Sequence, residues 1–156
     1  MLASTARRDG PTMSDVALVR ERVQTYLTQQ GPIVIDDNGN FTIQYGSTRV
    51  IIQVVAHPDE NATAVIVSAS MLFQVPLTAE LYRHVATHAD DWWFGHVYLV
   101  EAPDGTTGTI VARHLLLGDY LDKEELMYAI NGVGNSADAT DEQLQTLFGG
   151  KRYEDT

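Results

Sequence analysis

The sequence predicts an α+β domain in which an antiparallel sheet of about six strands is flanked by three helices, in the order α-β-β-β-β-α-β-β-α. Apolar and polar residues alternate at residues 41–45, the pattern of a half-buried strand. Apolar residues three and four apart, which give a helix one apolar face, occur near both ends of the chain. Only short segments separate the first four strands, and such short connections imply antiparallel pairing.

The first helix is expected to begin at Ser14, which can cap it, and to end at Gly31-Pro32. Residues 1–13 are polar and aperiodic, so we expect them to form a flexible N-terminal tail. The apolar stripe of this helix consists of Val16, Val19, Val23 and Leu27.

Four strands should follow, at residues 33–35, 41–45, 48–56 and 63–73. Asn38-Gly39 favours the positive φ of a hairpin turn between the first two. A second helix should begin after Thr78, its cap, and extend to about residue 89. The last two strands are expected at residues 94–102 and 107–117, joined by a turn.

The last helix should begin with Asp122 and Glu125 as an approximate capping box. Gly132 and Gly134 each cost about 1 kcal/mol relative to Ala inside a helix, so we expect a kink or break near residues 131–136. Residues 14–150 should form a single domain, followed by a polar tail at residues 151–156. One apolar stripe of the helix would contain Leu126, Ile130, Val133, Ala137, Leu144 and Phe148.

Composition argues against several classes of function. The chain of 156 residues has no cysteine, which excludes disulfides, thiolate metal sites and cysteine nucleophiles. Its net charge of −11, with scattered basic residues, argues against nucleic acid and anionic membranes as partners. No stretch approaches the roughly 18 apolar residues of a membrane span, and residues 1–12 contain no apolar signal-peptide run. We therefore expect a cytoplasmic protein.

Catalytic and metal-binding patterns are weak. His84 and His88 are four apart on the predicted second helix, with His96 nearby, and zinc often uses such a pair. However, the metalloprotease glutamate is missing from the residues between the pair. Ser68 and Ser70 lack the surroundings of a nucleophile elbow, and the pairs of aspartates are explained by a turn and a helix end. We expect no enzyme, no metal and no cofactor.

Three consecutive aromatic residues, Trp92, Trp93 and Phe94, form the candidate partner-binding site. Neighbouring residues of a strand face opposite sides, so the three rings cannot all enter one core. Aromatic residues are enriched at binding hot spots, and Phe73 and Tyr82 could extend the patch. The alternative, in which one or two rings pack under the second helix and another covers a sheet edge, remains open.

Five segments of the chain, residues 36–45, 75–81, 94–97, 117–121 and 148–150, form a familiar combination in their order and spacing. Together they resemble the YbjN-like proteins of the actinobacterial type, which share the fold of type III secretion chaperones, and the resemblance extends from about Val16 to Gly150. It implies a non-enzymatic, often dimeric domain with a peptide-binding or chaperone role, linked in some members to stress regulation. The family has no defined catalytic residues to assign here.

The leading hypothesis is a protein- or peptide-binding module of this type, acting as a chaperone or regulator and forming a homodimer. It would bind an apolar or basic client through a helix–sheet groove or an exposed strand edge. Two alternatives remain. The first is a domain that senses a small ligand in an enclosed pocket, with polar groups such as Arg113 or His114. The second is a metal-dependent enzyme that uses the three histidines.

Overall fold

The computed structural model describes residues 13–57, 62–88, 91 and 95–156. The order of helices and strands in this part of the chain is the predicted one, and two short 3-10 helices are added. The elements are α1 (Met13–Thr28), β1 (Val34–Ile35), β2 (Phe41–Tyr45), β3 (Thr48–Ala56), β4 (Thr63–Pro76), α2 (Ala79–Thr87), β5 (His96–Glu101), β6 (Thr107–Leu117), η1 (Gly118–Tyr120), α3 (Lys123–Phe148) and η2 (Tyr153–Asp155).

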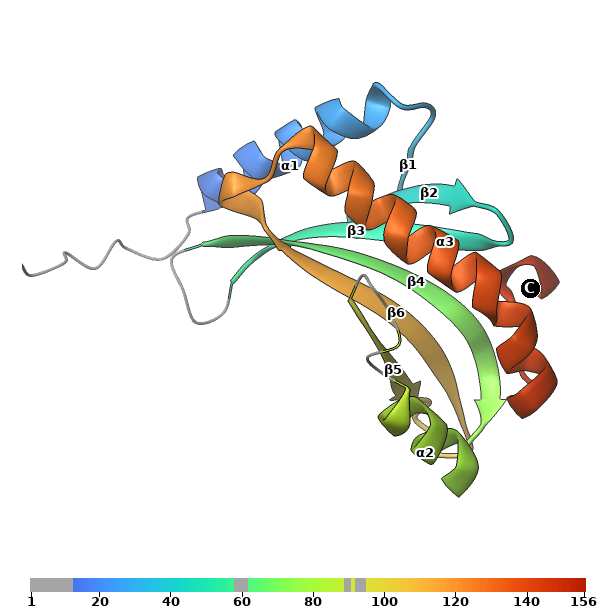
Figure 1. Cartoon of the computed structure of the whole chain (residues 1–156). Helices are drawn as coiled ribbons and strands as arrows, with labels where there is room; N and C mark the ends of the chain where they lie inside the picture. The colour runs from blue at the N-terminus through green and yellow to red at the C-terminus, as the bar shows by residue number, and fades with distance from the viewer. Residues whose placement is uncertain (1–12, 58–61, 89–90, 92–94) are drawn as a thin grey trace, which may run out of the picture.

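The six described strands form one sheet in the order β1-β2-β3-β4-β6-β5, and every pair is antiparallel. The first four strands form the predicted meander. After β4 the chain passes through α2, forms β5 at the far edge and returns as β6 between β4 and β5 (Figure 1).

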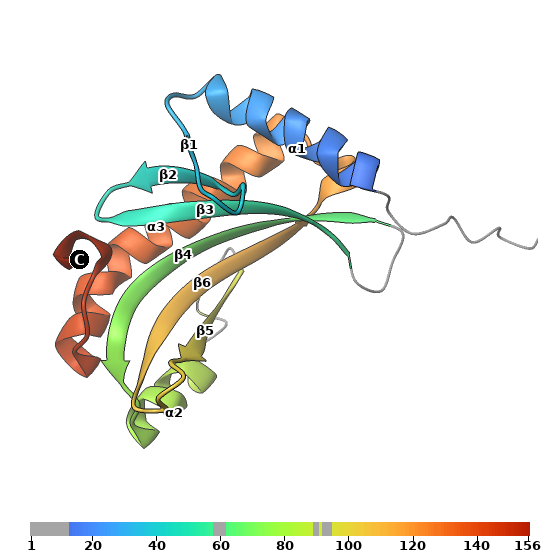
Figure 2. The same cartoon turned by 180° about the vertical axis from the view of Figure 1, so that it is seen from behind.

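The three helices lie on one face of this sheet. Figures 1 and 2 show α1 and α3 on the same side, and the buried cluster contains residues from all three helices together with inward-facing strand residues. In β4 the buried residues Val65, Val67, Ala69 and Met71 alternate with partly exposed ones, as a half-buried strand requires. No described helix lies across the opposite face (Figure 2).

Local signals in the sequence are confirmed at both helix caps and at the first hairpin. The side chains of Thr78 and Asp122 accept hydrogen bonds from the backbone N–H groups of Leu81 (3.1 Å) and Glu125 (2.7 Å). Gly39 has φ of 80°, the positive value that this turn requires.

The expected break in the last helix is wrong, because α3 is continuous through residues 131–136. Gly134 is buried where the helix contacts β2, and a Cβ atom there would lie 2.6 Å from the ring of Tyr45. The glycine therefore lets α3 approach the sheet, and this packing outweighs its helix cost of about 1 kcal/mol.

Some element boundaries also differ from the expected ones. The first helix begins at Met13, one residue before the expected cap, and α2 ends at Thr87. β4 extends to Pro76, beyond the expected end at residue 73, because two register shifts after Ser70 carry the strand onward beside β6. None of the described helices combines the length and the apolar character needed to span a membrane.

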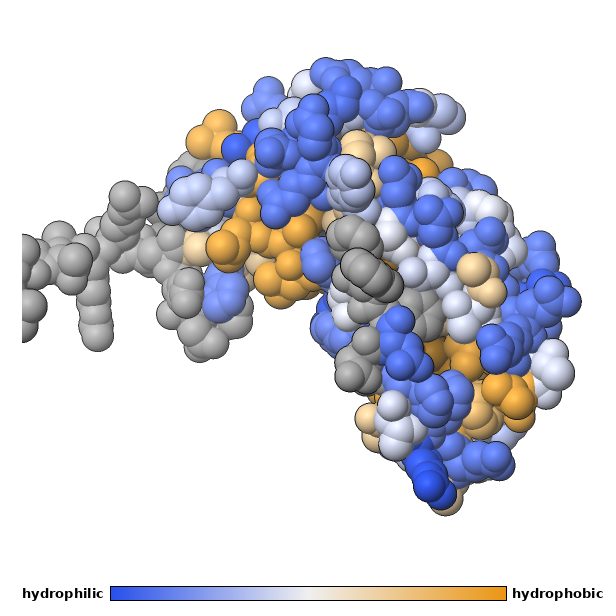
Figure 3. Space-filling model, viewed as in Figure 1, coloured by the Kyte–Doolittle hydropathy of each residue, from blue (hydrophilic) through white to orange (hydrophobic). Residues whose placement is uncertain are grey.

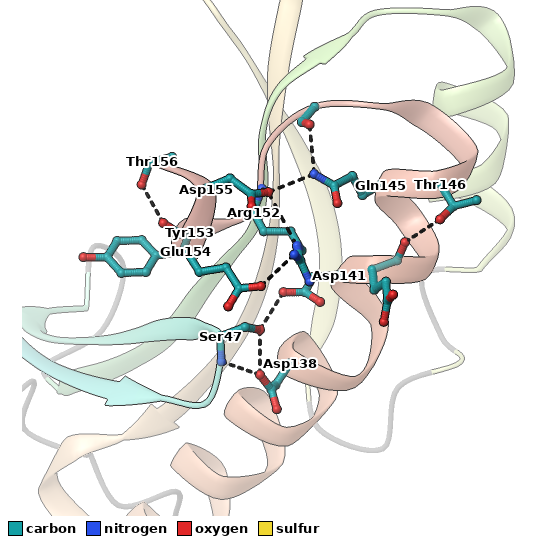
Figure 4. A network of polar contacts seen from close by, with 12 residues as sticks. Ser47, Asp138, Asp141, Gln145, Thr146, Arg152, Tyr153, Glu154, Asp155 and Thr156 are labelled. Carbon is teal, nitrogen blue, oxygen red and sulfur yellow. Dashed lines mark hydrogen bonds and ion pairs between the residues drawn. The ribbon is translucent and has the colours of Figure 1, made fainter.

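Residues 151–156, which were expected to form a polar C-terminal tail, lie against the domain. The backbone N–H and C=O groups of Lys151 exchange hydrogen bonds of 2.8 and 2.7 Å with Phe73 on β4. Arg152 pairs with Glu154 (2.7 Å), and Gln145 of α3 donates to Asp155 (2.9 Å) (Figure 4). This polar network joins the end of the chain to α3.

Candidate binding groove

A groove with a volume of about 410 Å³ lies between α2 and the C-terminal half of α3. Its floor is formed by Val97 of β5 and Ile110 of β6, which face the helices from neighbouring strands. The walls consist of His84, Val85, His88 and Asp91 on one side, and Ser136, Ala139, Thr140, Gln143 and Leu144 on the other.

The groove combines an apolar floor with polar walls. Val97, Ile110 and Leu144 are buried or nearly so, whereas Ala139 and Gln143 on α3 are exposed. Its size falls within the range of about 300–1,000 Å³ typical of ligand pockets, which are mostly apolar with a few polar groups that orient the ligand. The arrangement can therefore hold an apolar side chain or a small molecule and hydrogen-bond its polar part.

The two histidines of α2 form one unit in the wall. Their rings stack at 4.2 Å between centroids and 16° between planes, and the His84 ring lies 5.0 Å from that of Phe148. Burial lowers the pKa of His84, and the neighbouring His88 lowers it further, whereas Asp91 acts in the opposite direction. Because the resulting pKa is below the usual 6.5, this ring is mainly neutral at pH 7.

The three histidines considered for a metal site do not lie together, because His96 is apart from the other two. The ring nitrogen Nδ1 of His88 lies 3.0 Å from the carbonyl oxygen of His84 and 2.9 Å from the hydroxyl of Thr87. His96 is on β5, where its ring contacts Tyr98 at 5.6 Å, and it does not line the groove. Within the described ranges, no group of three or more His, Asp or Glu side chains is placed to hold a metal ion.

Of the predicted partner-binding residues, the two that the structure describes, Phe73 and Tyr82, do not line the groove. Trp92, Trp93 and Phe94 lie outside the described residues, although Asp91, which directly precedes them, lines the groove. Tyr82 is exposed on α2 and donates a hydrogen bond to Glu101 of β5. Phe73 borders a different hollow, formed with Gln74, Ala102, Thr107, Gly108, Thr109, Lys151 and Thr156.

The polar groups suggested for an enclosed pocket, Arg113 and His114, do not line the groove either. Sequence reasoning missed the α3 wall. The available signal was a stripe of small and polar residues at helical spacing, namely Ser136, Ala139, Thr140 and Gln143. It runs beside the apolar stripe of α3 and points to the neighbouring helix.

Comparison with known proteins gives one match that covers almost the whole described domain. A family model described as T3SS (YopN, CesT) and YbjN peptide-binding chaperone 1, or TY-Chap1, matches residues 15–156. A search of curated proteins found no match. Among solved structures, an uncharacterized protein from Methanothermobacter thermautotrophicus is 13% identical with a TM-score of 0.46, and the alignment covers 84% of this chain and 99% of that one. A likeness of that size supports no argument about function.

Proposed function

Because this chain belongs to the T3SS (YopN, CesT) and YbjN peptide-binding chaperone 1 family, we propose that it binds a peptide segment of a client protein in the groove between α2 and α3. Binding alone, without a catalytic step, would be its activity, in the role of a chaperone or a regulator. The cytoplasm is the proposed location, and a homodimer is the proposed form.

The observation that carries this proposal is the position of Val97. This residue belongs to β5, an edge strand that pairs with β6 on one side only within the described sheet, and it also forms the floor of the groove. An extended peptide can add to an exposed sheet edge through main-chain hydrogen bonds while alternate side chains enter neighbouring pockets. A client segment beside β5 would thus direct every second side chain to the helix-covered face of the sheet, next to Val97.

The walls suggest which side chains would fit. The apolar floor favours aliphatic or aromatic residues, and the neutral imidazole of His84 can donate or accept a hydrogen bond without adding charge. Asp91 on the rim supports the expected preference for clients that carry a basic residue beside an apolar one.

The test is to fill the groove from the exposed α3 wall. A displayed library of random 12-residue peptides would be selected on the full chain, and the enriched peptides titrated against Ala139→Phe and against the control Glu142→Phe. Ala139 lines the groove and Glu142 does not, and both are exposed on α3, so folding should tolerate both changes. We expect Ala139→Phe to weaken binding about tenfold or more and the control to bind like the wild type. Equal affinities for the two variants would contradict the proposal.

Binding of a small ligand is a second candidate function, favoured by the 410 Å³ volume and by the cluster of polar groups on the walls. Native mass spectrometry of the purified chain is the test. A bound compound that is retained by Glu142→Phe and absent from Ala139→Phe would support this alternative.

A further inference from the structure

The sheet face opposite the helices has an apolar half. Strand register places Ile66 of β4 beside Leu115 of β6, and Ala64 between Val55 of β3 and Leu117 of β6. Leu115 and Leu117 are 49% and 47% exposed, although both sit within a sheet. Figure 3 shows hydrophobic residues, in orange, gathered below α1.

The other half of the same face is polar and basic. The next row across the sheet runs from Ile51 through Ser68 and Arg113 to His96, and the row after it contains Ser70, Val111 and Tyr98. Arg49 projects from the same side of β3 as Ile51, because residues two apart share a face.

The charge of this face is opposite to that of the protein as a whole. The chain has 21 acidic and 10 basic residues. Yet none of the described strand residues that project from this face is Asp or Glu, and two of them, Arg49 and Arg113, are arginines. The described strand residues of this face are therefore apolar, polar or basic on an acidic molecule, and of its two arginines Arg49 lies against Tyr153 of η2, 4.4 Å from the ring centroid.

Arg113 is held in place at the centre of the basic half. Its guanidinium carbon lies 4.9 Å from the centroid of the Tyr98 ring, an orientation that fixes the side chain against β5. Its Nε atom is buried, and no hydrogen-bond partner for it is found among the described residues. The planar guanidinium of an arginine is suited to a carboxylate, which it can bind through two parallel hydrogen bonds.

We propose that this open sheet face binds an acidic amphipathic segment of a protein partner. The apolar side of the segment packs on Val55, Ile66, Leu115 and Leu117, and one of its carboxylates pairs with Arg113. Charge complementarity selects this partner, because the basic area attracts an acidic segment while the acidic remainder of the molecule repels it. The surface is separate from the α2–α3 groove and prefers the opposite charge, so the two proposals can fail independently.

The experiment uses three synthetic amphipathic 16-residue peptides with identical leucine positions and with Glu, Gln or Lys at the polar positions. Each is titrated by fluorescence anisotropy against the full chain at low and high salt. We expect the Glu peptide to bind about tenfold more tightly than the Gln peptide at low salt, and to lose most of this advantage at high salt. Equal binding of the Glu and Gln peptides would overturn the proposal.

Substitutions then locate the site. Arg113→Gln should remove the preference for the Glu peptide and leave binding of the Gln peptide unchanged, whereas Arg83→Gln, an exposed arginine on α2, should keep the preference. Leu115→Gln should weaken both peptides, and thermal unfolding checks that the variants are folded. Undiminished binding of the Glu peptide by Arg113→Gln would overturn the proposal.

Two further outcomes would show that the peptide binds in the groove or that the open face has a different occupant. If Ala139→Phe abolishes binding of the Glu peptide, the peptide occupies the groove, and the open-face proposal fails while the groove proposal stands. If Leu115→Gln converts a dimer into a monomer in sedimentation without peptide, a second copy of the chain covers the face, and the proposal also fails.

Discussion

Gly134 shows how a residue that weakens a helix in isolation can be required by the structure around it. The residue is buried, and the Tyr45 ring occupies the space that a side chain would need. The hydroxyl of Tyr45 lies 3.5 Å from the side chain of Asn131, one turn earlier on α3. Tyr45 therefore packs across the glycine and joins β2 to the middle of α3.

The substitution Gly134→Ala should destabilise the protein by about 1–3 kcal/mol, because the added methyl group overpacks the contact with Tyr45. In the background of Tyr45→Ala the clash disappears, and the same substitution should instead stabilise by up to about 1 kcal/mol through helix propensity. Urea unfolding of the four proteins measures both values. A destabilisation that persists without the tyrosine ring would show that another contact requires the glycine.

The environment of His84 predicts how stability depends on pH. Burial lowers its pKa in the folded state below the ordinary value of 6.5, so the unfolded chain binds the proton more readily. The contribution of a neutral His84 is thus fully present above pH 6.5 and is lost as pH falls through 6.5 toward the folded pKa. His114 is also shifted downward by burial and acts with the same sign.

We therefore expect the free energy of unfolding to decrease between pH 7.5 and pH 5.5, and to decrease less steeply in His84→Gln. Urea titrations at the two pH values provide the test. The carboxylates of Asp138 and Asp155, whose pKa values are lowered mainly by hydrogen bonds, respond only in more acidic solution. A variant that keeps the full pH dependence would show that His84 does not contribute to it.

At the scale of elements, the position of the C-terminal segment depends on backbone geometry that its residue pattern does not predict. Gly149 and Gly150 have φ values of 75° and 88°, which turn the chain back from α3 toward β4. A Cβ atom on Gly150 would lie 2.7 Å from the carbonyl oxygen of Phe73, so the close approach needs glycine. η2 contains no buried residue, and polar contacts and the Lys151 backbone bonds hold the segment.

The substitution Gly150→Ala should release this segment, and hydrogen exchange at the amides of Phe73 and Lys151 should accelerate because their mutual bonds are lost. Gly105→Ala is the matched control. Gly105 also has positive φ, 67°, but no atom lies within 4 Å of the added methyl group. The control should lose about 1 kcal/mol of stability and keep slow exchange at both amides. Fast exchange in both variants would indicate a general loss of stability.

Features that depend on residues close together in the sequence could be predicted, whereas features that depend on contacts between distant residues could not. The bounds of β3 and β6 were predicted to the residue, because alternation and turn residues are local signals. The continuity of α3 could not be predicted, since the ring that explains Gly134 belongs to Tyr45, far away in the sequence. The docking of residues 151–156 depends on Phe73, which is equally distant.

The groove was predictable only in part, for the same reason. The spacing of His84 and His88 indicated a shared helix face, and the structure bears this out in their stacked rings. The opposite wall comes from α3, and nothing in its sequence identifies α2 as its neighbour. The stripe of small and polar residues signals a surface, while the pairing of the two helices arises from the path of the chain through β5 and β6.

At the scale of the whole molecule, covering only one sheet face leaves apolar side chains in contact with solvent. Leu115, Leu117 and Val55 are exposed on the open face, and Tyr128 and Leu147 on α3. Together with the family resemblance, the exposed Tyr128 and Leu147 of α3, which lie away from the open face, motivate the proposed homodimer, since stable interfaces typically bury about 1,600 Å². Sedimentation equilibrium should show a species of twice 17.2 kDa at micromolar concentration. A single 17.2 kDa species at high micromolar concentration would rule the dimer out.

The path of the chain through the sheet also has a consequence during synthesis. β3 and β4 are joined by a short loop and can pair as soon as both have left the ribosome. The other edge of β4 pairs with β6, which is synthesised only after α2 and β5, so this edge stays unpaired for longer. A nascent chain that ends before residue 107 therefore carries an unpaired edge along its longest strand. Unpaired edges recruit strands from other chains, so aggregation during translation should be greatest in this interval and should fall once residues 107–117 have emerged.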